Sequence, residues 1–357
     1  MGGAWTRRGA LALLAAATAA RGRAAGGATA PGTLGLSVGF DALRWQRDAA
    51  LAGELDAYAA AGVRWLRTDL DWSAVQPEGP ERFDWTPFDR IARGAAARGI
   101  AVLPIPNRTP AWARTDPAAP SPPADPGAFA AFVEGAVRRY RPLGLRHWEI
   151  WNEPNLAAFW PPSPDARAYA AVLRAAAGAV RGADAGATVI LGGLAAVQET
   201  GPIPSPPRRM RHRAAVGFLE DVYRHAGADA FDAVGFHPYS HPAPPDMAGL
   251  RNGWSLMARG VRGVMARHGD AGKPVWITEY GAPTVPARGG VSLAEQADFL
   301  EGAHALAAAT PWAGPLFWYS WADLGTDEDD PEHWFGLLRG DGTPKPAHRR
   351  FRALAGG

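Results

Sequence analysis

Two glutamates end short apolar segments of this 357-residue chain, and each is placed where it could act on a bound molecule. Glu153 lies in HWEIWNEPN, residues 147–155, and Glu279 lies in VWITEYG, residues 275–281. Each segment has the pattern of a buried strand that ends in a carboxylate. Hydrolysis of a glycosidic bond with retention needs such a pair, one acid that protonates the leaving oxygen and one nucleophile across the anomeric carbon. The pair therefore predicts this chemistry.

The neighbours of the two glutamates fit different tasks. An acid must keep its proton, and Trp148, Trp151 and Pro154 supply apolar surroundings that disfavour the charged form of Glu153. A nucleophile must stay ionised, so we expect hydrogen-bond donors around Glu279. The candidate donors are Tyr239, Tyr280 and Arg67.

Short apolar segments alternate with Ala-rich helical patterns along the chain. Strands are predicted at residues 34–40, 64–70, 100–106, 146–152, 188–194, 232–238, 274–280 and 314–320. Helices are predicted at residues 48–61, 86–98, 127–140, 165–182, 214–226, 253–268, 292–309 and 346–354. Eight strand–helix units are what the α/β class requires for a (β/α)8 TIM barrel. A doubly wound open sheet is the competing fold, but no Gly-rich phosphate loop follows the first strand.

The barrel predicts where chemically capable side chains meet, because its active sites are built at the C-terminal ends of the strands. Side chains at those ends are Arg67, Asp69, Asn107, Asn152, Glu153, His237, Tyr239, Glu279, Trp318 and Trp321. The alternative is that both glutamates are ordinary exposed strand-end residues, as most glutamates are. Two of them in matching contexts, within a chain of this architecture, favour a site.

The motifs resemble those of the clan A retaining glycoside hydrolases, barrels in which an Asn-Glu pair supplies the acid/base and a later Glu the nucleophile. Within the clan, the sequence is most similar to glycoside hydrolase family 39 and to cellulase-like proteins of family 5. The resemblance covers essentially the whole chain after residue 30. The segments that carry it are 62–69 (GVRWLRTD), 83–85 (FDW), 148–155 (WEIWNEPN), 235–239 (GFHPY) and 276–281 (WITEYG).

The resemblance implies a role for each matching residue. Glu153 would be the acid/base and Glu279 the nucleophile, while Asn152 would hydrogen-bond the sugar 2-hydroxyl. Arg67 matches the second-strand arginine that lies near the nucleophile and helps to keep it ionised. For Arg67 the alternative is a salt bridge to Asp69 or to another acid of the barrel.

Two further strands carry matching residues. His237 and Tyr239 match the sixth-strand pair that lines the same floor, although His237 fits a packed strand-end histidine equally well. Asn107, on the third strand, lies where relatives often have a different polar residue, so its role stays open.

Tryptophan is frequent in this chain, with 15 residues, and sugars stack their C–H faces on aromatic rings. The candidates for such subsite walls are Trp318 and Trp321 at the eighth strand and Trp112 and Trp160 in loops after the third and fourth strands. Trp318 is the leading candidate. Trp65, Trp148 and Trp276 fall inside strands, so we expect them in the core.

Composition limits the partners. The chain is 47% apolar and 20% charged, as in globular proteins, and its net charge is +2. Four of its arginines lie in the first 30 residues, which hold no acid, so the rest is nearly neutral and nothing argues for nucleic acid. Without cysteine the chain forms no disulfide, which leaves the compartment open.

Residues 1–30 have the pattern of a signal peptide, with a disordered Ala-rich tail as the alternative. Arg7 and Arg8 precede an apolar run, residues 9–20, and residues 28–30 fit a cleavage site. The paired arginines fit a twin-arginine signal only loosely. We expect a secreted or periplasmic protein, with residues 31–357 as its catalytic domain and no membrane span after cleavage.

The expected partner is a carbohydrate, and the expected state is a monomer that requires no cofactor or metal. A β-linked glucan, xylan or mixed exopolysaccharide is the substrate class that the resemblance implies. A glycan-binding pseudoenzyme and a transglycosylase are the alternatives. Three loops stay unassigned, the Pro- and Arg-rich 198–213, the irregular 240–252 and the acidic 323–332, which lacks the spacing of a calcium loop.

Overall fold

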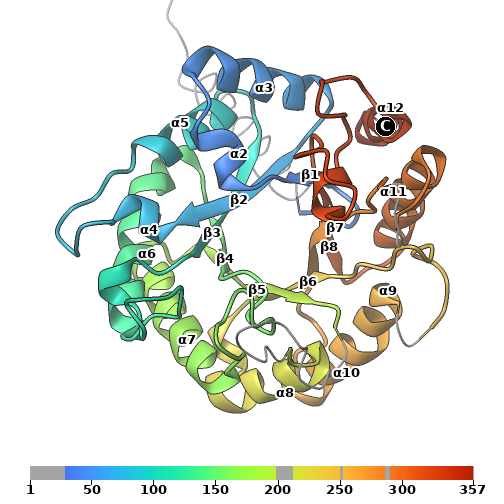
Figure 1. Cartoon of the computed structure of the whole chain (residues 1–357). Helices are drawn as coiled ribbons and strands as arrows, with labels where there is room; N and C mark the ends of the chain where they lie inside the picture. The colour runs from blue at the N-terminus through green and yellow to red at the C-terminus, as the bar shows by residue number, and fades with distance from the viewer. Residues whose placement is uncertain (1–28, 198–211, 250–251, 286–289, 357) are drawn as a thin grey trace, which may run out of the picture.

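The computed structural model describes residues 29–197, 212–249, 252–285 and 290–356. Eight parallel strands form a ring in the middle of the molecule, and helices surround it (Figure 1). The strands are β1 (Leu34–Ser37), β2 (Trp65–Asp71), β3 (Ala101–Asn107), β4 (His147–Ile150), β5 (Thr188–Ala195), β6 (Ala233–His237), β7 (Val275–Tyr280) and β8 (Ala313–Tyr319). Each overlaps a predicted strand, so the predicted (β/α)8 barrel is confirmed.

The predicted helices are found as well. They are α3 (Asp48–Ala60), α5 (Thr86–Ala96), α6 (Pro126–Tyr140), α7 (Ala166–Ala183), α8 (Ala215–Ala226), α11 (Leu293–Ala308) and α12 (Pro346–Ala355). The helix predicted at residues 253–268 is divided into α9 (Gly253–Ser255), the π-helical η4 (Leu256–Val261) and α10 (Arg262–Arg267). Short helices that were not predicted are α2 (Phe40–Arg44), α4 (Trp72–Val75), η1 (Ala111–Ala113), η2 (Arg141–Leu143), η3 (Ala228–Ala230) and η5 (Pro331–Trp334).

Side-chain caps set where several helices begin. Asp165 accepts hydrogen bonds from two backbone N–H groups at the start of α7. Ser292 and Glu295 form a reciprocal capping box at the start of α11. Asp71 ends β2 and caps α4 at once, so the chain turns without a connecting loop above this strand.

The ring closes between β3 and β4, which are the two ends of the hydrogen-bonded strand order β3-β2-β1-β8-β7-β6-β5-β4. At this seam the Trp151 N–H donates to the Pro106 carbonyl at 3.1 Å, so the backbone of Pro106 faces β4. Pro104 lies two residues earlier in β3 and faces the same side. Proline has no N–H to donate, which explains why the seam lacks a regular ladder.

Two apolar layers hold the barrel together. Inside the ring, Trp65, Trp276 and Phe317 pack in one cluster, and the His147 ring lies 5.1 Å and 5.2 Å from the two tryptophan rings. Burial in this layer lowers the pKa of His147 to about 4, so His147 is neutral. Trp148 lies in the larger cluster between strands and helices. The core positions predicted for Trp65, Trp148 and Trp276 are confirmed.

Several predictions concern segments that the structure describes only in part. Residues 1–28, with most of the predicted signal peptide, lie outside the described residues, and so does most of the loop 198–213. The secretion signal therefore stays a prediction. Among the described residues, no helix combines the length and the apolar character that crossing a membrane requires.

Candidate active site

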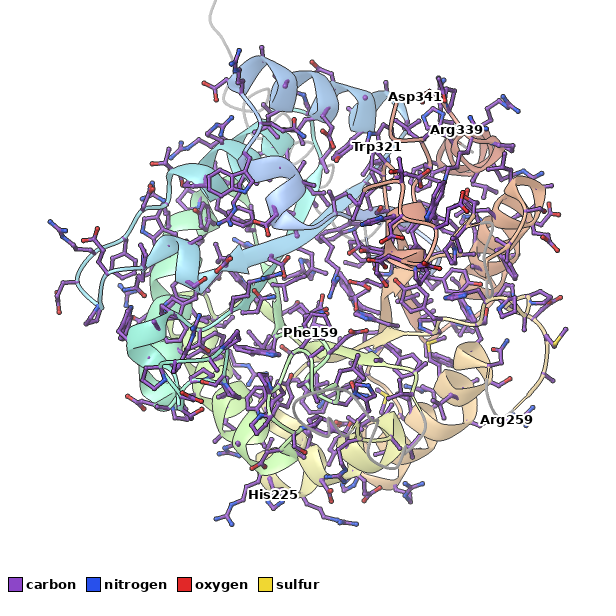
Figure 2. The ribbon with its side chains drawn as sticks, in the orientation of Figure 1. Phe159, His225, Arg259, Trp321, Arg339 and Asp341 are labelled. Atoms are coloured by element: carbon purple, nitrogen blue, oxygen red, sulfur yellow. The ribbon has the colours of Figure 1, made fainter. Side chains whose placement is uncertain are left out.

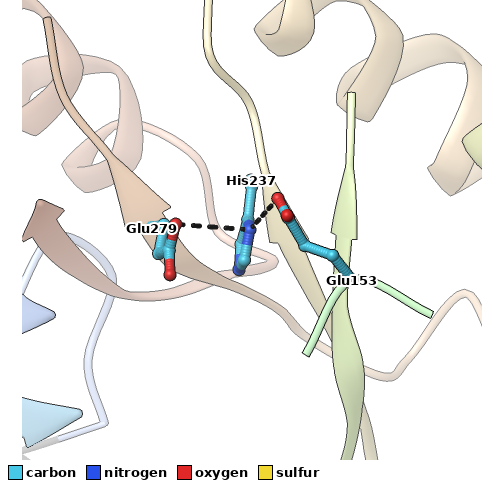
Figure 3. A group of neighbouring side chains, drawn as sticks. All are labelled: Glu153, His237 and Glu279. Atoms are coloured by element: carbon cyan, nitrogen blue, oxygen red, sulfur yellow. Dashed lines mark hydrogen bonds and ion pairs between the residues drawn. The ribbon is translucent and has the colours of Figure 1, made fainter. Parts of the chain in front are cut away.

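The two glutamates come together at the C-terminal ends of the strands. Glu153 follows β4, Glu279 lies near the end of β7, and His237 ends β6 between them (Figure 3). His237 is fully buried, with Nδ1 2.8 Å from Glu153 Oε1 and 3.6 Å from Glu279 Oε2. One carboxylate oxygen of each glutamate and one ring nitrogen of His237 all lie within 4.8 Å of one another. The structure thus places His237 in the site and not in a separate packed position.

Glu279 is surrounded by donors. Arg67 Nη1 forms an ion pair with Glu279 Oε1, the Tyr239 hydroxyl donates to Oε2 at 3.1 Å, and the Ser37 hydroxyl lies 3.4 Å from Oε1. Burial on its own would raise the pKa of Glu279, but the nearby His237 and Arg67, with the hydrogen bonds from Tyr239 and Arg67, lower it below the usual value. Glu279 therefore stays ionised under conditions where a free carboxyl begins to protonate.

Two of the three predicted donors, Arg67 and Tyr239, are confirmed, whereas Tyr280 is wrong. The Tyr280 hydroxyl hydrogen-bonds Ser240 at 3.0 Å, and its ring lies against Trp254 in the outer layer. An irregular register in β7 separates the two neighbours, because the pairing with β8 shifts between Ile277 and Tyr280. Between these two pairs β7 has one residue more than β8, which makes a bulge. Glu279 therefore points into the site while Tyr280 points outward, and bulges often re-aim side chains in this way.

Arg67 is the centre of a buried network. Its Nε donates to Glu149 Oε2 at 2.7 Å, and its Nη2 donates to Glu149 Oε1 at 3.0 Å and to Asn152 Oδ1 at 2.7 Å. Burial opposes the guanidinium charge, but the charges of Glu149 and Glu279 outweigh it and raise the pKa of Arg67 further. The salt bridge considered for Arg67 thus exists with Glu149 and Glu279, and Asp69 acts on it only through its charge.

Sequence reasoning missed Glu149, which is fully buried and lies two residues before the end of the apolar segment. Strand alternation was the available signal, because Glu149 shares the inward face of β4 with His147. Its Oε1 also accepts the Gly193 N–H at 2.7 Å. Glu149 therefore fixes the orientation of the Arg67 guanidinium, so that Nη1 faces Glu279 and Nη2 faces Asn152.

Gly193 in β5 lets these groups approach closely. A Cβ at this position would lie 2.1 Å from His237 Nε2 and 2.7 Å from the Thr278 hydroxyl. The Gly193 carbonyl also accepts the Glu153 N–H at 3.0 Å. Glu153 itself has a φ of 42°, an uncommon value for a residue with a side chain. The backbone of β5 is therefore part of what holds the acid/base candidate in place.

The two asparagines line a pocket beside the glutamates. Asn152 is buried and accepts from Arg67, while Asn107 is buried and donates to Asp69. Trp112 is half-buried, and its Nε1 donates to the Gln76 carbonyl at 2.8 Å.

The stacking walls predicted at the eighth strand are contradicted. Trp318 has no exposed surface and packs edge-on against Tyr280 in the outer layer. Trp321 is 6% exposed and lies against Tyr58 and His348, toward the surrounding helices (Figure 2). For Trp318, strand alternation explains the error, since a one-residue difference reverses the face of a strand residue. Trp321 lies beyond the end of β8. Trp160, at 2% exposed, is likewise packed in the core.

Tyr319 is the aromatic residue of β8 that faces the site. Its hydroxyl donates to Glu332 Oε2 at 3.0 Å. Burial, with the charges of Glu332, Glu279 and Glu153, raises the pKa of Tyr319. Its ring packs 5.3 Å from Phe335, which in turn contacts Tyr239.

Glu153, His237 and Glu279 are also the described residues whose spacing would fit a metal ion. Their atoms already have protein partners, because Glu279 accepts from Arg67 and Tyr239, and His237 bridges Glu153 and Thr278. Two carboxylates of the acidic loop 323–332 also have partners within the protein. Asp323 forms a buried ion pair with Lys345 at 2.7 Å, and Asp330 caps η5.

No protein-family model and no curated protein matches the sequence. Solved structures do match it. A family 39 glycoside hydrolase from the gut symbiont Bacteroides cellulosilyticus WH2 has a TM-score of 0.70 at 24% identity, over 91% of this chain and 64% of that one. A monomeric beta-xylosidase from Caulobacter crescentus CB15 has a TM-score of 0.66 at 20% identity, over 91% and 68% of the two chains.

A glucosidase from Croceicoccus marinus is similar to the same extent, with a TM-score of 0.65 at 18% identity, over 92% of this chain and 68% of that one. This chain thus spans less than two thirds of the length of the Bacteroides enzyme and slightly more of the other two. At these identities the likeness concerns the fold. The chain has the (β/α)8 barrel fold seen in these glycoside hydrolases, as its motifs predict.

Proposed function

We propose that this protein is a retaining β-glycosidase that hydrolyses O-glycosidic bonds of a β-linked oligo- or polysaccharide. The observation that supports this most is the pairing of Glu153 and Glu279, which come from β4 and β7 and face each other in unlike surroundings. Glu279 is paired with a buried arginine, while the Glu153 carboxylate is paired with the Nδ1 of His237. Such asymmetry divides the roles of nucleophile and acid/base between two carboxyl groups.

In the first step, a Glu279 oxygen would attack the anomeric carbon while the glycosidic C–O bond breaks. The proton of Glu153 would pass to the leaving oxygen. In the second step, Glu153 would take a proton from water as that water attacks the same carbon and releases Glu279. Asn152, held by Arg67 at 2.7 Å, would donate its amide N–H to the sugar 2-hydroxyl.

The spacing of the carboxylates supports retention. Retaining enzymes place the two groups about 5 Å apart, whereas inverting enzymes leave about 6.5–9.5 Å for a water molecule. Here an oxygen of Glu153 lies within 4.8 Å of an oxygen of Glu279. This short separation supports the retaining arrangement over the inverting one.

Hydrolysis of a panel of aryl β-glycosides, and of glucan and xylan oligosaccharides, tests the proposal. Wild type should cleave at least one member. Glu279→Ala should lose turnover and regain it with azide, which gives an α-glycosyl azide. Glu153→Ala should still react in the first step with 2,4-dinitrophenyl glycosides, whose leaving group needs no acid. Azide, which needs no base, should then restore turnover and give a β-glycosyl azide.

Glu332→Ala is the matched control, because it removes another carboxylate close to Tyr319. This variant should form no glycosyl azide. A folded wild type that binds these sugars but cleaves none would favour the glycan-binding alternative. Release of the inverted anomer as the first product would contradict the assignment of Glu279.

A further inference from the structure

A pocket of about 230 Å³ lies beside the catalytic pair, and Asn152 is the lining residue that the steps above use. It opens over the ends of β2, β3 and β4, and Asn152 belongs to both the pocket and the site. Its other lining residues of chemical interest are Asp69, Asn107, Arg108, Thr109, Arg114 and Phe159. A substrate unit adjacent to the scissile bond would enter here.

Two arginines, Arg108 and Arg114, line this pocket. Arg108 is exposed and has a φ of 58°, with its carbonyl fixed by the Ser73 N–H at 2.9 Å. Arg114 is half-buried and donates from Nε to the Thr109 carbonyl at 2.8 Å, so its remaining N–H groups are oriented. Among the residues that the structure describes, neither arginine forms an ion pair.

One carboxylate, Asp69, lines the same pocket and is already engaged. Asp69 accepts a hydrogen bond from the Asn107 amide and interacts with the charge of Arg67. The pocket lining itself therefore carries two positive groups and one negative group. Asp71, buried behind the lining residue Ser73, interacts with the charge of Arg108 from outside the lining. The positive charges in contact with a ligand are thus those of Arg108 and Arg114, and a carboxylate is the group that complements them.

Two buried polar atoms on the floor also lack a partner. They are Asn107 Oδ1 and the Thr109 hydroxyl oxygen, on side chains of residues only 5% and 3% exposed. Buried polar groups in proteins are nearly always hydrogen-bonded, so these two point to a ligand or to water bound to a ligand. A sugar hydroxyl can satisfy both, because it donates and accepts.

Phe159 completes the pocket with an aromatic surface. It is one of the large apolar side chains that the described structure leaves exposed, at 38%, and it lies toward the middle of the ring (Figure 2). A sugar can stack its C–H face on such a ring. The pocket thus combines an aromatic wall, hydroxyl partners and a fork of cations.

We propose that this pocket binds a uronic acid unit of the substrate next to the scissile bond, with its carboxylate held by Arg108 and Arg114. A planar carboxylate matches the guanidinium fork and forms charge-assisted hydrogen bonds. The inference rests on the proposed glycosidase and names its substrate class as an acidic, β-linked saccharide.

Binding of matched oligosaccharides to Glu279→Gln, measured by titration calorimetry, tests the inference without turnover. The first pair is cellotetraose and the tetramer of β-1,4-linked glucuronate. The second pair is xylotetraose and xylotriose carrying one 4-O-methylglucuronate. In at least one pair the acidic member should bind about tenfold or more tightly, and added salt should reduce this preference.

Adding Arg108→Gln and Arg114→Gln should remove the preference. The matched control is Arg82→Gln with Arg138→Gln, which changes the net charge equally at two exposed helix or loop positions and should keep the preference. Arg108→Gln alone serves if the double variant fails to fold, because Arg108 is exposed.

Equal or tighter binding of the neutral member in both pairs, absence of binding by all four sugars, or a preference that survives loss of the arginines would overturn the inference. Hydrolysis by wild type is measured separately. A protein that prefers the acidic sugars but cleaves none would contradict the glycosidase and not the pocket. A protein that cleaves neutral glycosides but shows no preference for the acidic sugars would contradict the pocket and support the glycosidase.

Discussion

The charge on Glu279 depends on a few donors that are themselves buried. Tyr239 contributes one hydrogen bond at 3.1 Å, and burial, followed by the charge of Glu279, raises the pKa of Tyr239 well above its usual value, so it remains a donor. The low pKa of Glu279 is therefore built from contacts that a single substitution can weaken one at a time.

Tyr239→Phe removes only that hydrogen bond. A hydrogen bond to a charged group contributes about 1.5–3 kcal/mol, and 1.36 kcal/mol corresponds to one pKa unit. The pKa of Glu279 should rise by about one to two units, so the acidic limb of the kcat/KM profile should move to higher pH by the same amount. Thermal unfolding checks that the fold is intact. If the acidic limb does not move, Tyr239 does not help to set the pKa of Glu279.

The reversed faces of Trp318 and Tyr319 give a second test at this scale. Trp318→Phe should lower the free energy of unfolding by about 1–3 kcal/mol and leave KM nearly unchanged, because Trp318 is core. Tyr319→Ala should raise KM about tenfold, which corresponds to about 1.4 kcal/mol of lost contact. Tyr319→Phe, the matched control, keeps the ring. A raised KM for Trp318→Phe with an unchanged KM for Tyr319→Ala would instead make Trp318 the sugar-facing residue.

At the scale of elements, strand ends do more than carry side chains, because their backbone controls how closely those side chains meet. The register shifts of β5 and β7 fall where Gly193 and Glu279 lie. Bulges of this kind re-aim residues at active sites. The loop after β8, which carries Glu332 and Phe335, is tied down by the buried pair of Asp323 and Lys345.

Gly193→Ala should disturb β5, because the new Cβ would lie 2.1 Å from His237 Nε2. Overpacking of this kind costs about 1–3 kcal/mol. We expect a lower melting temperature together with a loss of kcat, since a shift of His237 would disturb its contact with Glu153. Gly178→Ala in α7 is the control, because no atom lies within 4 Å of its Cβ, and Ala should stabilise that helix by about 0.5–1 kcal/mol.

Lys345→Met should leave Asp323 buried without its cation. Removal of one partner of a buried pair costs about 3–5 kcal/mol, while replacing both with apolar residues often restores stability. Chemical denaturation should therefore show Lys345→Met with Asp323→Leu to be more stable than Lys345→Met alone. Equal stability of the two variants would mean that the pair does not hold the loop.

At the scale of the whole molecule, the sequence predicts the barrel well because each strand and helix repeats a short local pattern. It also predicts Arg67, His237 and Tyr239 at the site, since strand ends converge in this fold. Strand alternation places Glu149 on the inward face, but its partners Arg67 and Gly193 come from other strands and meet it only in the closed barrel.

Other features require the closed barrel before they can be seen. The need for Gly193 arises from His237, which is 44 positions away in the chain. The acidic-sugar pocket joins residues of three strand ends, and Phe159 belongs to a loop with no periodic pattern. The outward face of Trp318 follows from the register of the last strand, which apolar residues on both faces leave undefined.

The most direct test of the assignment is to trap the glycosyl-enzyme. Wild type is incubated with 2,4-dinitrophenyl 2-deoxy-2-fluoro-β-glycosides of glucose, xylose and glucuronic acid, and intact and digested protein are analysed by mass spectrometry. One glycosyl group should add to the protein, on the peptide that contains Glu279, and none should add to Glu279→Gln. A wild type that hydrolyses the non-fluorinated glycosides yet carries its label elsewhere, or releases the inverted anomer first, would contradict the account.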